Sequence, residues 1–193
     1  MLISEDQLKQ IYKNCNKLNL KRYCEAFNKV FPIYDINTPN RIAAFLGQVA
    51  VESGELKYTR ELPSKWNKKV VSDKSEPTGT LYEGRKNLGN TQPGDGPKFI
   101  GRGILQLTGR ANYEDYSKKL GIDLAANPFL AEDPETSVKI ACQYFKDRNL
   151  LKLADQWNLA EITRRVNGTA MLHHEQRVAY SQIAKKVLQP LVS

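Results

Sequence analysis

The chain has 193 residues, of which 40% are hydrophobic and 26% are charged, and its formal net charge is +8. This size and composition are typical of one soluble globular domain with a proper core, and they exclude a disordered or fibrous chain. No apolar run approaches the roughly 18 residues of a membrane helix, and the first residues lack the charged and apolar regions of a secretory signal.

Two helices are expected at the beginning of the chain. Ser4 and Gln7 have the spacing of a capping box, which predicts that a first helix begins there. A second helix is predicted to open at Asn19, because apolar residues then recur at helical spacing, and to end at Pro32.

A third helix is predicted from the pair Thr38 and Pro39, a capping residue followed by a proline at the first helical position. Its apolar residues recur at helical spacing, and Glu52 falls in its last turn. Gly54 is expected to stop this helix. The carboxyl of Glu52 is therefore expected in a rigid, half-buried place.

The segment from Pro63 to Gly103 is polar and rich in Gly, Pro, Asn and Lys. It is predicted to form loops with a little strand or short helix, and irregular segments of this length are usually functional. We expect it to wall a substrate cleft. The short apolar segment Ile104–Leu107 follows, and Ala111–Leu120 is predicted to be helical, closed by Gly121.

Three further helices are expected in the last third of the chain. Asp133 and Pro134 cap a long one, and Asn158 with Glu161 caps a short one that ends near Asn167. A final amphipathic helix is predicted from about His174 to Leu188. The fold class is therefore mainly α, in a single domain spanning residues 1–193, without a separate wall-binding module.

The excess of positive charge suggests a polyanionic partner, either nucleic acid or an anionic bacterial envelope. The basic residues are dispersed along the chain, without a run of five or more and without a nucleic-acid motif. This pattern favours the envelope and predicts no nucleic acid as a partner.

Other motifs point to no cofactor. The three cysteines are too few and too apolar in setting for a disulfide framework, so buried free thiols in a reducing cytoplasm are expected. His173 and His174 are adjacent, unlike the histidines of helical zinc sites, and the glycines at 94–103 lack the ending of a phosphate loop. Trp66 and Trp157 are candidates either for sugar stacking or for the core.

Glu52 and Glu61, nine residues apart, are the candidate catalytic pair. Cleavage of a glycosidic bond needs one carboxyl to protonate the leaving oxygen and a second to activate water or to attack the sugar. A half-buried position for Glu52 favours the protonated form that a general acid needs, whereas Glu61, beyond Gly54, is expected in a wetter setting. Solvated surface carboxylates are the alternative interpretation of such a spacing.

The sequence motifs that surround these glutamates favour the catalytic interpretation. From Arg41 to about Tyr180 the chain resembles glycoside hydrolase family nineteen, the chitinase-like enzymes, and most closely its phage endolysin branch. The resemblance is carried by five motifs in the order of the family: Ala43–Gly54, Tyr82–Asn90, Pro93–Gly96, Phe99–Tyr113 and Ile162–Gly168.

The resemblance implies a role for each matching residue. Glu52 would be the general acid, Glu61 the general base, and Thr108 the hydroxyl that holds the attacking water. The residues implied to line the sugar cleft are Gln106, Asn112, Tyr113, Asn167 and Arg177. The family also implies a lysozyme-like, two-lobed architecture with a substrate cleft between the lobes, and inversion of the anomeric configuration.

The function expected from these observations is that of a monomeric endolysin-type glycosidase acting on the β-1,4 glycan strands of bacterial peptidoglycan. It would be made in the bacterial cytoplasm, as in phage infection, and would lyse the cell after release to the wall, without stable membrane insertion. The alternatives are a chitinase acting on N-acetylglucosamine polymers and a non-catalytic glycan-binding protein.

Overall fold

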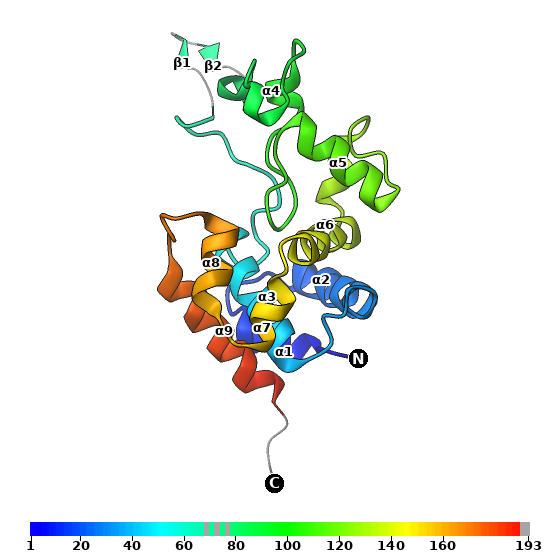
Figure 1. Ribbon diagram of the computed structural model, residues 1–193, viewed down its shortest axis with the longest axis vertical. Helices are drawn as coiled ribbons and strands as arrows, with labels where there is room; N and C mark the ends of the chain where they lie inside the picture. The colour runs from blue at the N-terminus through cyan, green and yellow to red at the C-terminus, as the bar shows by residue number, and fades with distance from the viewer. Residues whose placement is uncertain (68–69, 72–73, 76–77, 190–193) are drawn as a thin grey trace. The chain divides into compact units, whose positions relative to one another are not determined.

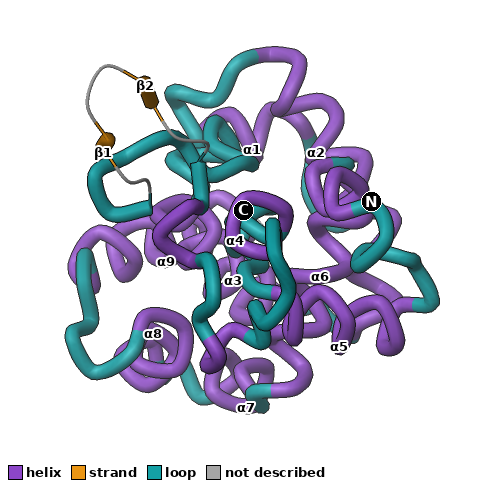
Figure 2. Tube along the Cα trace, turned by 90° about the horizontal axis from the view of Figure 1, so that it is seen from above, coloured by secondary structure: helices purple, strands orange, loops and turns teal. Residues whose placement is uncertain are grey.

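The computed structural model describes residues 1–67, 70–71, 74–75 and 78–189, and the chain divides into two compact units (Figure 1). Unit 1 comprises Met1–Lys57 and Ala141–Ser193, and unit 2 comprises Tyr58–Ile140. Helices account for most of the regular structure along the trace (Figure 2), which confirms the predicted mainly α fold.

Unit 1 is a bundle of helices around α3. Its helices are α1 (Glu5–Ile11), α2 (Lys17–Val30), α3 (Pro39–Glu52), α7 (Leu150–Asp155), α8 (Leu159–Asn167) and α9 (His174–Leu188), with the short 3-10 helix η1 (Phe31–Tyr34). The helix α6 (Pro134–Asp147) begins in unit 2 and ends in unit 1. α3 packs against α7, α8 and α9, and its residues from Ile42 to Ala50 are all buried.

Local capping chemistry sets where these helices begin. Ser4 and Gln7 form the predicted capping box of α1, and the Thr38 side chain caps α3 by accepting from the Arg41 N–H. The second helix begins earlier than predicted, because the side chain of Asn16 accepts from the N–H of Asn19 at 2.8 Å and is the true N-cap.

A row of phenylalanines fills the interior of unit 1. The ring centroids of Phe27 and Phe31 lie 4.9 Å apart, those of Phe31 and Phe45 lie 5.1 Å apart, and those of Phe45 and Phe145 lie 4.8 Å apart. Such aromatic pairs stabilise the fold by more than the burial of their surface alone. The row joins α2, α3 and the end of α6 into one core.

α3 and α9 approach each other closely because α3 carries a glycine at the contact. A methyl group on Gly47 would lie 1.9 Å from the Ser181 Oγ and 2.7 Å from the Arg177 carbonyl oxygen. Any larger side chain at residue 47 would therefore push α9 away from α3.

Unit 2 has little regular structure before the helix α5. It contains the short helices η2 (Thr80–Tyr82), η3 (Lys86–Leu88), α4 (Asp95–Lys98) and η4 (Pro128–Glu132), the helix α5 (Arg110–Leu120) and the strands β1 (Val70–Val71) and β2 (Lys74–Ser75). The two strands pair antiparallel, Val70 opposite Ser75 and Val71 opposite Lys74. Residues 68–69, 72–73 and 76–77 of the predicted irregular segment lie outside the described residues.

Two other expectations can be compared with the structure. Cys15, Cys24 and Cys142 are all buried, as predicted, and burial raises the pKa of each thiol. Among the helices of the described ranges, none combines the length and apolar character that crossing a membrane requires.

Candidate active site

Glu52 is the last residue of α3, as the sequence predicts, and its side chain is 22% exposed. Its Oε1 accepts from the Arg177 Nη2 on α9 at 2.6 Å. The side chain of Arg177 is only 2% exposed, so the prediction that Arg177 lines the sugar cleft is corrected: its guanidinium holds the carboxyl of Glu52.

A buried polar network holds Arg177 itself. Its Nη1 donates to the Gln48 Oε1 at 2.9 Å, and its Nε donates to the carbonyl of Leu172 at 3.1 Å. Gln48 is fully buried one turn before Glu52, and its amide also contacts the hydroxyl of Thr163 at 3.4 Å. Because the guanidinium is a rigid fork with fixed donor directions, these partners fix the direction from which it meets Glu52.

Glu61 lies in unit 2, and three donors converge on its carboxylate. Its Oε1 accepts from the Asn67 Nδ2 at 2.7 Å and from the Tyr82 hydroxyl at 2.5 Å, and its Oε2 accepts from the Gly101 N–H at 3.0 Å. Burial, and then the hydrogen bond to Glu61, raises the pKa of Tyr82, so its hydroxyl remains a donor. All three partners donate, which suits an ionised carboxylate, since that group only accepts.

Backbone pairing places Glu61 beside the glycine-flanked segment that the sequence singles out. The Glu61 N–H donates to the Gly101 carbonyl at 2.8 Å. Arg102 and Leu107 exchange two backbone hydrogen bonds, at 2.8 and 3.1 Å, and so fold the segment back on itself. The motif therefore forms a small pleated scaffold for the candidate base.

The side chains of this scaffold face one small volume next to Gly101. A methyl group on Gly101 would lie 2.7 Å from the Gln106 Oε1, 3.2 Å from the Thr108 Oγ1 and 3.4 Å from the Glu61 Oε2. Gln106 has a left-handed backbone with φ of 52°, and its Nε2 donates to the Gly103 carbonyl at 2.9 Å. The structure thus brings together Glu61, Gln106 and Thr108, three residues that the sequence proposes for the site.

Tyr113 is 0% exposed and belongs to the core of unit 2. Its hydroxyl donates to the Ile100 carbonyl at 2.9 Å and accepts from the Arg102 Nη1 at 3.2 Å. Burial raises the pKa of Tyr113 to about 12. The prediction that this side chain lines the sugar cleft is therefore wrong, because the side chain is not accessible to a ligand. Tyr113 instead supports residues 100–102 through these hydrogen bonds.

The two predicted asparagines lie nearer the surface, and their sugar contacts stay predictions. Asn112 is exposed, and its Nδ2 donates to the Thr108 carbonyl at 2.7 Å. Asn167 is partly exposed, and its Oδ1 accepts from the Leu172 N–H at 2.6 Å. Asn112 therefore braces the backbone of Thr108, and Asn167 braces the backbone of Leu172, whose carbonyl accepts from Arg177.

The two tryptophans differ in exposure. Trp66 is 75% exposed and immediately precedes Asn67, which donates to Glu61. Trp157 is partly buried, with the Lys185 Nζ 4.1 Å from the centre of its ring. Trp66 is therefore the more exposed of the two, with the Lys65 Nζ 4.8 Å from the centre of its ring.

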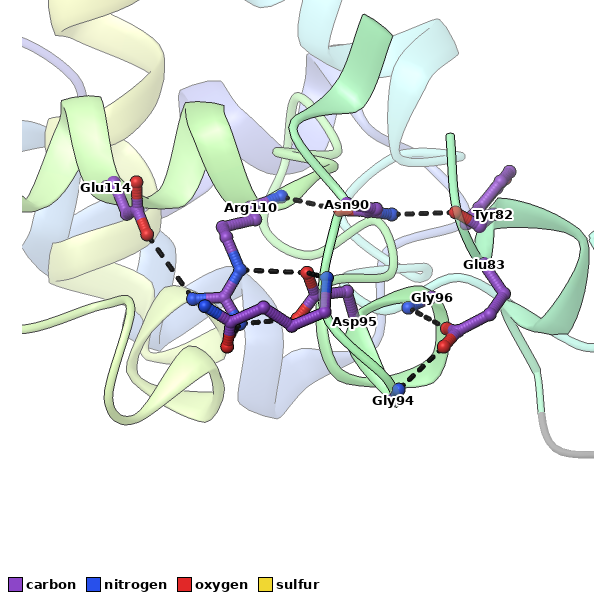
Figure 3. A network of polar contacts seen from close by, with 9 residues as sticks. Tyr82, Glu83, Asn90, Gly94, Asp95, Gly96, Arg110 and Glu114 are labelled. Carbon is purple, nitrogen blue, oxygen red and sulfur yellow. Dashed lines mark hydrogen bonds and ion pairs between the residues drawn. The ribbon is translucent and has the colours of Figure 1, made fainter. Parts of the chain in front are cut away.

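A polar network, drawn in Figure 3, holds the backbone that carries Tyr82. The Asn90 Nδ2 donates to the Tyr82 carbonyl at 3.0 Å, and the Asn90 Oδ1 accepts from the Arg110 N–H at 2.9 Å. Arg110 forms an ion pair with the buried Asp95, and its hydrogen bonds lower the pKa of that carboxyl. The sequence did not identify Tyr82 or Asn67 as site residues, because their contacts with Glu61 come from folding of the loop.

The glycines at 94–96 have a structural use in this network. The N–H groups of Gly94 and Gly96 donate to the carboxylate of Glu83, at 2.6 and 2.7 Å (Figure 3). These donors are therefore not presented to a phosphate. In the part of the chain that the structure describes, no group of three or more His, Cys, Asp or Glu residues is placed to hold a metal ion.

We predict that Thr108→Val lowers kcat more than it raises KM. The Thr108 hydroxyl donates its hydrogen to the Gln106 carbonyl at 2.8 Å, so toward a substrate water it can only accept. Valine keeps the shape and removes this acceptor, at a cost of about 1 kcal/mol in stability. Steady-state kinetics on a soluble oligosaccharide, with thermal melting, checks this. A loss of activity that only parallels the loss of stability would contradict it.

Comparison with known proteins places these features in a family. The profile of the family described as chitinase class I matches residues 9–158. A protein of Haemophilus influenzae (strain ATCC 51907 / DSM 11121 / KW20 / Rd), described as a glycosyl hydrolase family 19 domain-containing protein, is 38% identical over 88 residues, which are 46% of this chain. The match spans 42% of that relative, less than half its length.

Solved structures share the fold. Chitinase C from Streptomyces griseus HUT6037 has a TM-score of 0.70 at 23% identity, covering 97% of this chain and 76% of that one. A bacterial family 19 chitinase has a TM-score of 0.71 at 21% identity, with coverage of 97% and 95%. The class IV chitinase of family 19 from Zea mays has a TM-score of 0.65 at 18% identity, with coverage of 97% and 92%.

Proposed function

This chain belongs to the chitinase class I family, family 19 of the glycoside hydrolases, and we propose that it hydrolyses the β-1,4 glycan strands of bacterial peptidoglycan by an inverting mechanism. The observation that carries the proposal is the arrangement around Gly101. There a carboxylate held by three donors, Glu61, shares one small volume with the oxygens of Gln106 and Thr108. These oxygens are close enough together to hold one water molecule between them, and in the proposed reaction that water is deprotonated.

In the proposed reaction Glu52 is the general acid and Glu61 the general base. Water donates one hydrogen to Glu61 and the other to the Thr108 oxygen, which leaves a lone pair for the anomeric carbon. As the new C–O bond forms, the glycosidic bond breaks, the leaving oxygen takes the proton of Glu52, and Glu61 takes a proton from the water. Arg177 directs the Glu52 carboxyl throughout.

Peptidoglycan is preferred to chitin as the substrate because of the charge of the chain. A net charge of +8 attracts an anionic wall, whereas chitin is a neutral polymer. Chitinase activity is the second candidate, since the similar solved structures are chitinases and both polymers contain N-acetylglucosamine. Exposed Trp66, close in sequence to Glu61, would supply a stacking surface for either sugar chain.

The deciding experiment compares purified sacculi with soluble chitin oligomers at equal enzyme concentration. Faster turnover of sacculi, with mass spectrometry showing muropeptides that carry a new reducing-end sugar, supports the proposal. The identity of that sugar also fixes which bond is cut. Equal or faster turnover of chitin oligomers would favour the chitinase, and binding without any product would favour a non-catalytic glycan-binding protein.

The biological setting proposed is that of a phage-type lysin. The enzyme would be made in the bacterial cytoplasm, reach the wall after release and lyse the cell as a monomer. A turbidity assay on permeabilised cells, in which the wall is accessible from outside, tests lysis without depending on the route of release.

We predict that lysis weakens as salt rises, whereas turnover of a neutral soluble oligosaccharide changes much less. At about 0.15 M salt the screening length is ~8 Å, so the attraction between the basic protein and the wall is largely lost. Initial rates on sacculi and on chitin oligomers across a salt series check this. Equal salt dependence on both substrates would remove the electrostatic argument for peptidoglycan.

A further inference from the structure

Glu55, three residues after Glu52, is a buried carboxylate that the proposed mechanism does not use. Glu55 is only 5% exposed. Gly54, Glu55 and Leu56 all have left-handed backbones, with φ of 56°, 59° and 66°. Two of these are not glycine, and left-handed conformations of such residues persist only where surrounding contacts enforce them.

The Leu56 N–H of this turn donates to the Ser53 Oγ at 2.8 Å, and the Leu56 carbonyl accepts from the Asn19 Nδ2 at 2.8 Å. Further contacts come through the carboxylate of Glu55. Its Oε2 accepts from the Asn14 N–H at 2.6 Å, and its Oε1 accepts from the Asn14 Nδ2 at 3.0 Å and from the Tyr180 hydroxyl at 2.5 Å. Asn14 lies in the turn between α1 and α2, and Tyr180 lies on α9. One side chain thus ties the end of α3 to two other parts of unit 1.

This contact repeats the spacing of the contact between Glu52 and Arg177. Glu55 follows Glu52 by three residues, and Tyr180 follows Arg177 by three residues on α9, which places both α9 side chains on one face of the helix. On the same helix, the carbonyl of Arg177 and the hydroxyl of Ser181 lie against Gly47 of α3. α3 and α9 are therefore fixed by a close glycine contact at one place and by two carboxylate contacts beyond it.

We infer that Glu55 and Tyr180 are a positioning pair, which fixes the end of α3 against α9 and so sets how Arg177 meets the carboxyl of Glu52. The inference rests on the proposed role of Glu52 as the general acid. Neither residue is offered as a catalytic residue. The Tyr180 hydroxyl gives its hydrogen to Glu55, and burial followed by that hydrogen bond raises the pKa of Tyr180 to about 12, so it stays protonated.

The test uses Tyr180→Phe and Glu55→Gln in the full chain. Phenylalanine keeps the ring and removes only the hydroxyl. Glutamine places an N–H₂ group against one of the donors that now point at the carboxylate. Because misplacement of a reacting group by about 1 Å can cost ~100-fold, we expect kcat on a soluble oligosaccharide to fall by about 10- to 100-fold, with KM changed less than about twofold.

Tyr12→Phe is the matched control. Its hydroxyl is buried in the same unit and donates to the Leu46 carbonyl of α3 at 2.6 Å rather than to Glu55. Its ring packs edge-on against the ring of Tyr180, with centroids 6.2 Å apart, and phenylalanine keeps that ring contact. This variant is expected to lower the melting temperature at least as much as Tyr180→Phe while keeping kcat. A fall in kcat for Tyr12→Phe that matches its loss of stability would overturn the inference, since general loosening would then explain both variants.

A double-mutant cycle gives the second readout. If both contacts act on one carboxyl, Tyr180→Phe should lower kcat much less in an Arg177→Lys background than in the wild type. Independent, multiplicative effects on kcat would overturn the inference. Its failure is distinguishable from failure of the proposed function. If Glu52→Gln stays active, the assignment of Glu52 as the acid is wrong. If Glu52→Gln is inactive but Tyr180→Phe has wild-type kcat, only the inference about the positioning pair is wrong.

Discussion

Glu52→Gln is expected to keep the fold and to lose ~100- to 10,000-fold in activity, the usual contribution of a general acid. The amide has nearly the shape of the carboxyl, and its oxygen can still accept from Arg177, which remains held by Gln48 and by the Leu172 carbonyl. The buried guanidinium therefore keeps its partners. What the variant loses is the proton that the leaving oxygen needs.

The measurement is kcat on a soluble oligosaccharide beside the turbidity assay on permeabilised cells, with circular dichroism to confirm the fold. Glu25→Gln is the control, because it makes the same chemical change on an exposed position of α2. Retention of more than about a tenth of wild-type activity by Glu52→Gln would show that the acid is misassigned.

The parts of the fold that the sequence predicts well are those governed by local chemistry. Thr38 with Pro39, the capping box at Ser4 and the final helix His174–Leu188 were all predicted and are present. The sequence predicts the start of α2 three residues late, because Asn16 and Asn19 are both good capping residues. The side chain of Asn19 instead donates to the Leu56 carbonyl at 2.8 Å.

The sequence does not predict α7, an α-helix of the described residues. α7 spans only Leu150–Asp155, so it is too short for an apolar repeat to show in the sequence. The residue before it, Asn149, has a left-handed backbone with φ of 53°. An asparagine in that conformation sharply redirects the chain, but asparagine occurs in many other turns, so the sequence alone gives no specific signal.

The candidate site divides in the same way. Helix length and the stop at Gly54 place Glu52 at the end of α3, whereas the contact with Arg177 joins residues 125 apart and follows only from the packing of α3 against α9. Likewise, the contact of Tyr82 with Glu61 depends on the course of the intervening loop.

Tyr113 shows how a motif can mislead. It follows Asn112 directly, but adjacent residues on a helix point about 100° apart, so one is exposed while the other is buried. The signal that identifies Tyr113 as a core residue was available: Tyr116 lies three positions later on the same face, and it is buried too. Helical periodicity should therefore outweigh motif membership when a sugar-contacting role is assigned.

Glu61→Gln is expected to abolish activity to a similar extent, ~100- to 10,000-fold, because it removes the general base. It should also cost stability, unlike the change at Glu52. Asn67, Tyr82 and Gly101 all donate to the Glu61 carboxylate, so either orientation of the amide turns its N–H₂ group toward a donor. An unmet hydrogen bond of this kind costs about 1–3 kcal/mol.

Glu83→Gln separates the loss of stability from the loss of the base. Glu83 lies in the same unit, and its carboxylate also accepts two backbone N–H donors, from Gly94 and Gly96. The variant therefore meets the same conflict of donors without touching Glu61. We expect both variants to melt at lower temperature than the wild type and only Glu61→Gln to lose activity. If Glu83→Gln is equally inactive, the loss at Glu61 reports instability rather than chemistry.

The stereochemistry of the wild-type reaction then decides how Glu61 acts. A base that activates water delivers the oxygen to the face opposite the leaving group, so a β-linked oligosaccharide gives an α product first. A nucleophile would form a glycosyl intermediate and give a β product. Proton NMR of the first product, before mutarotation, distinguishes the two. Because oxygens of Glu61, Thr108 and Gln106 converge beside Gly101, where together they could hold a water molecule, we expect the α anomer. An initial β product would make Glu61 the nucleophile and leave Thr108 without water to hold.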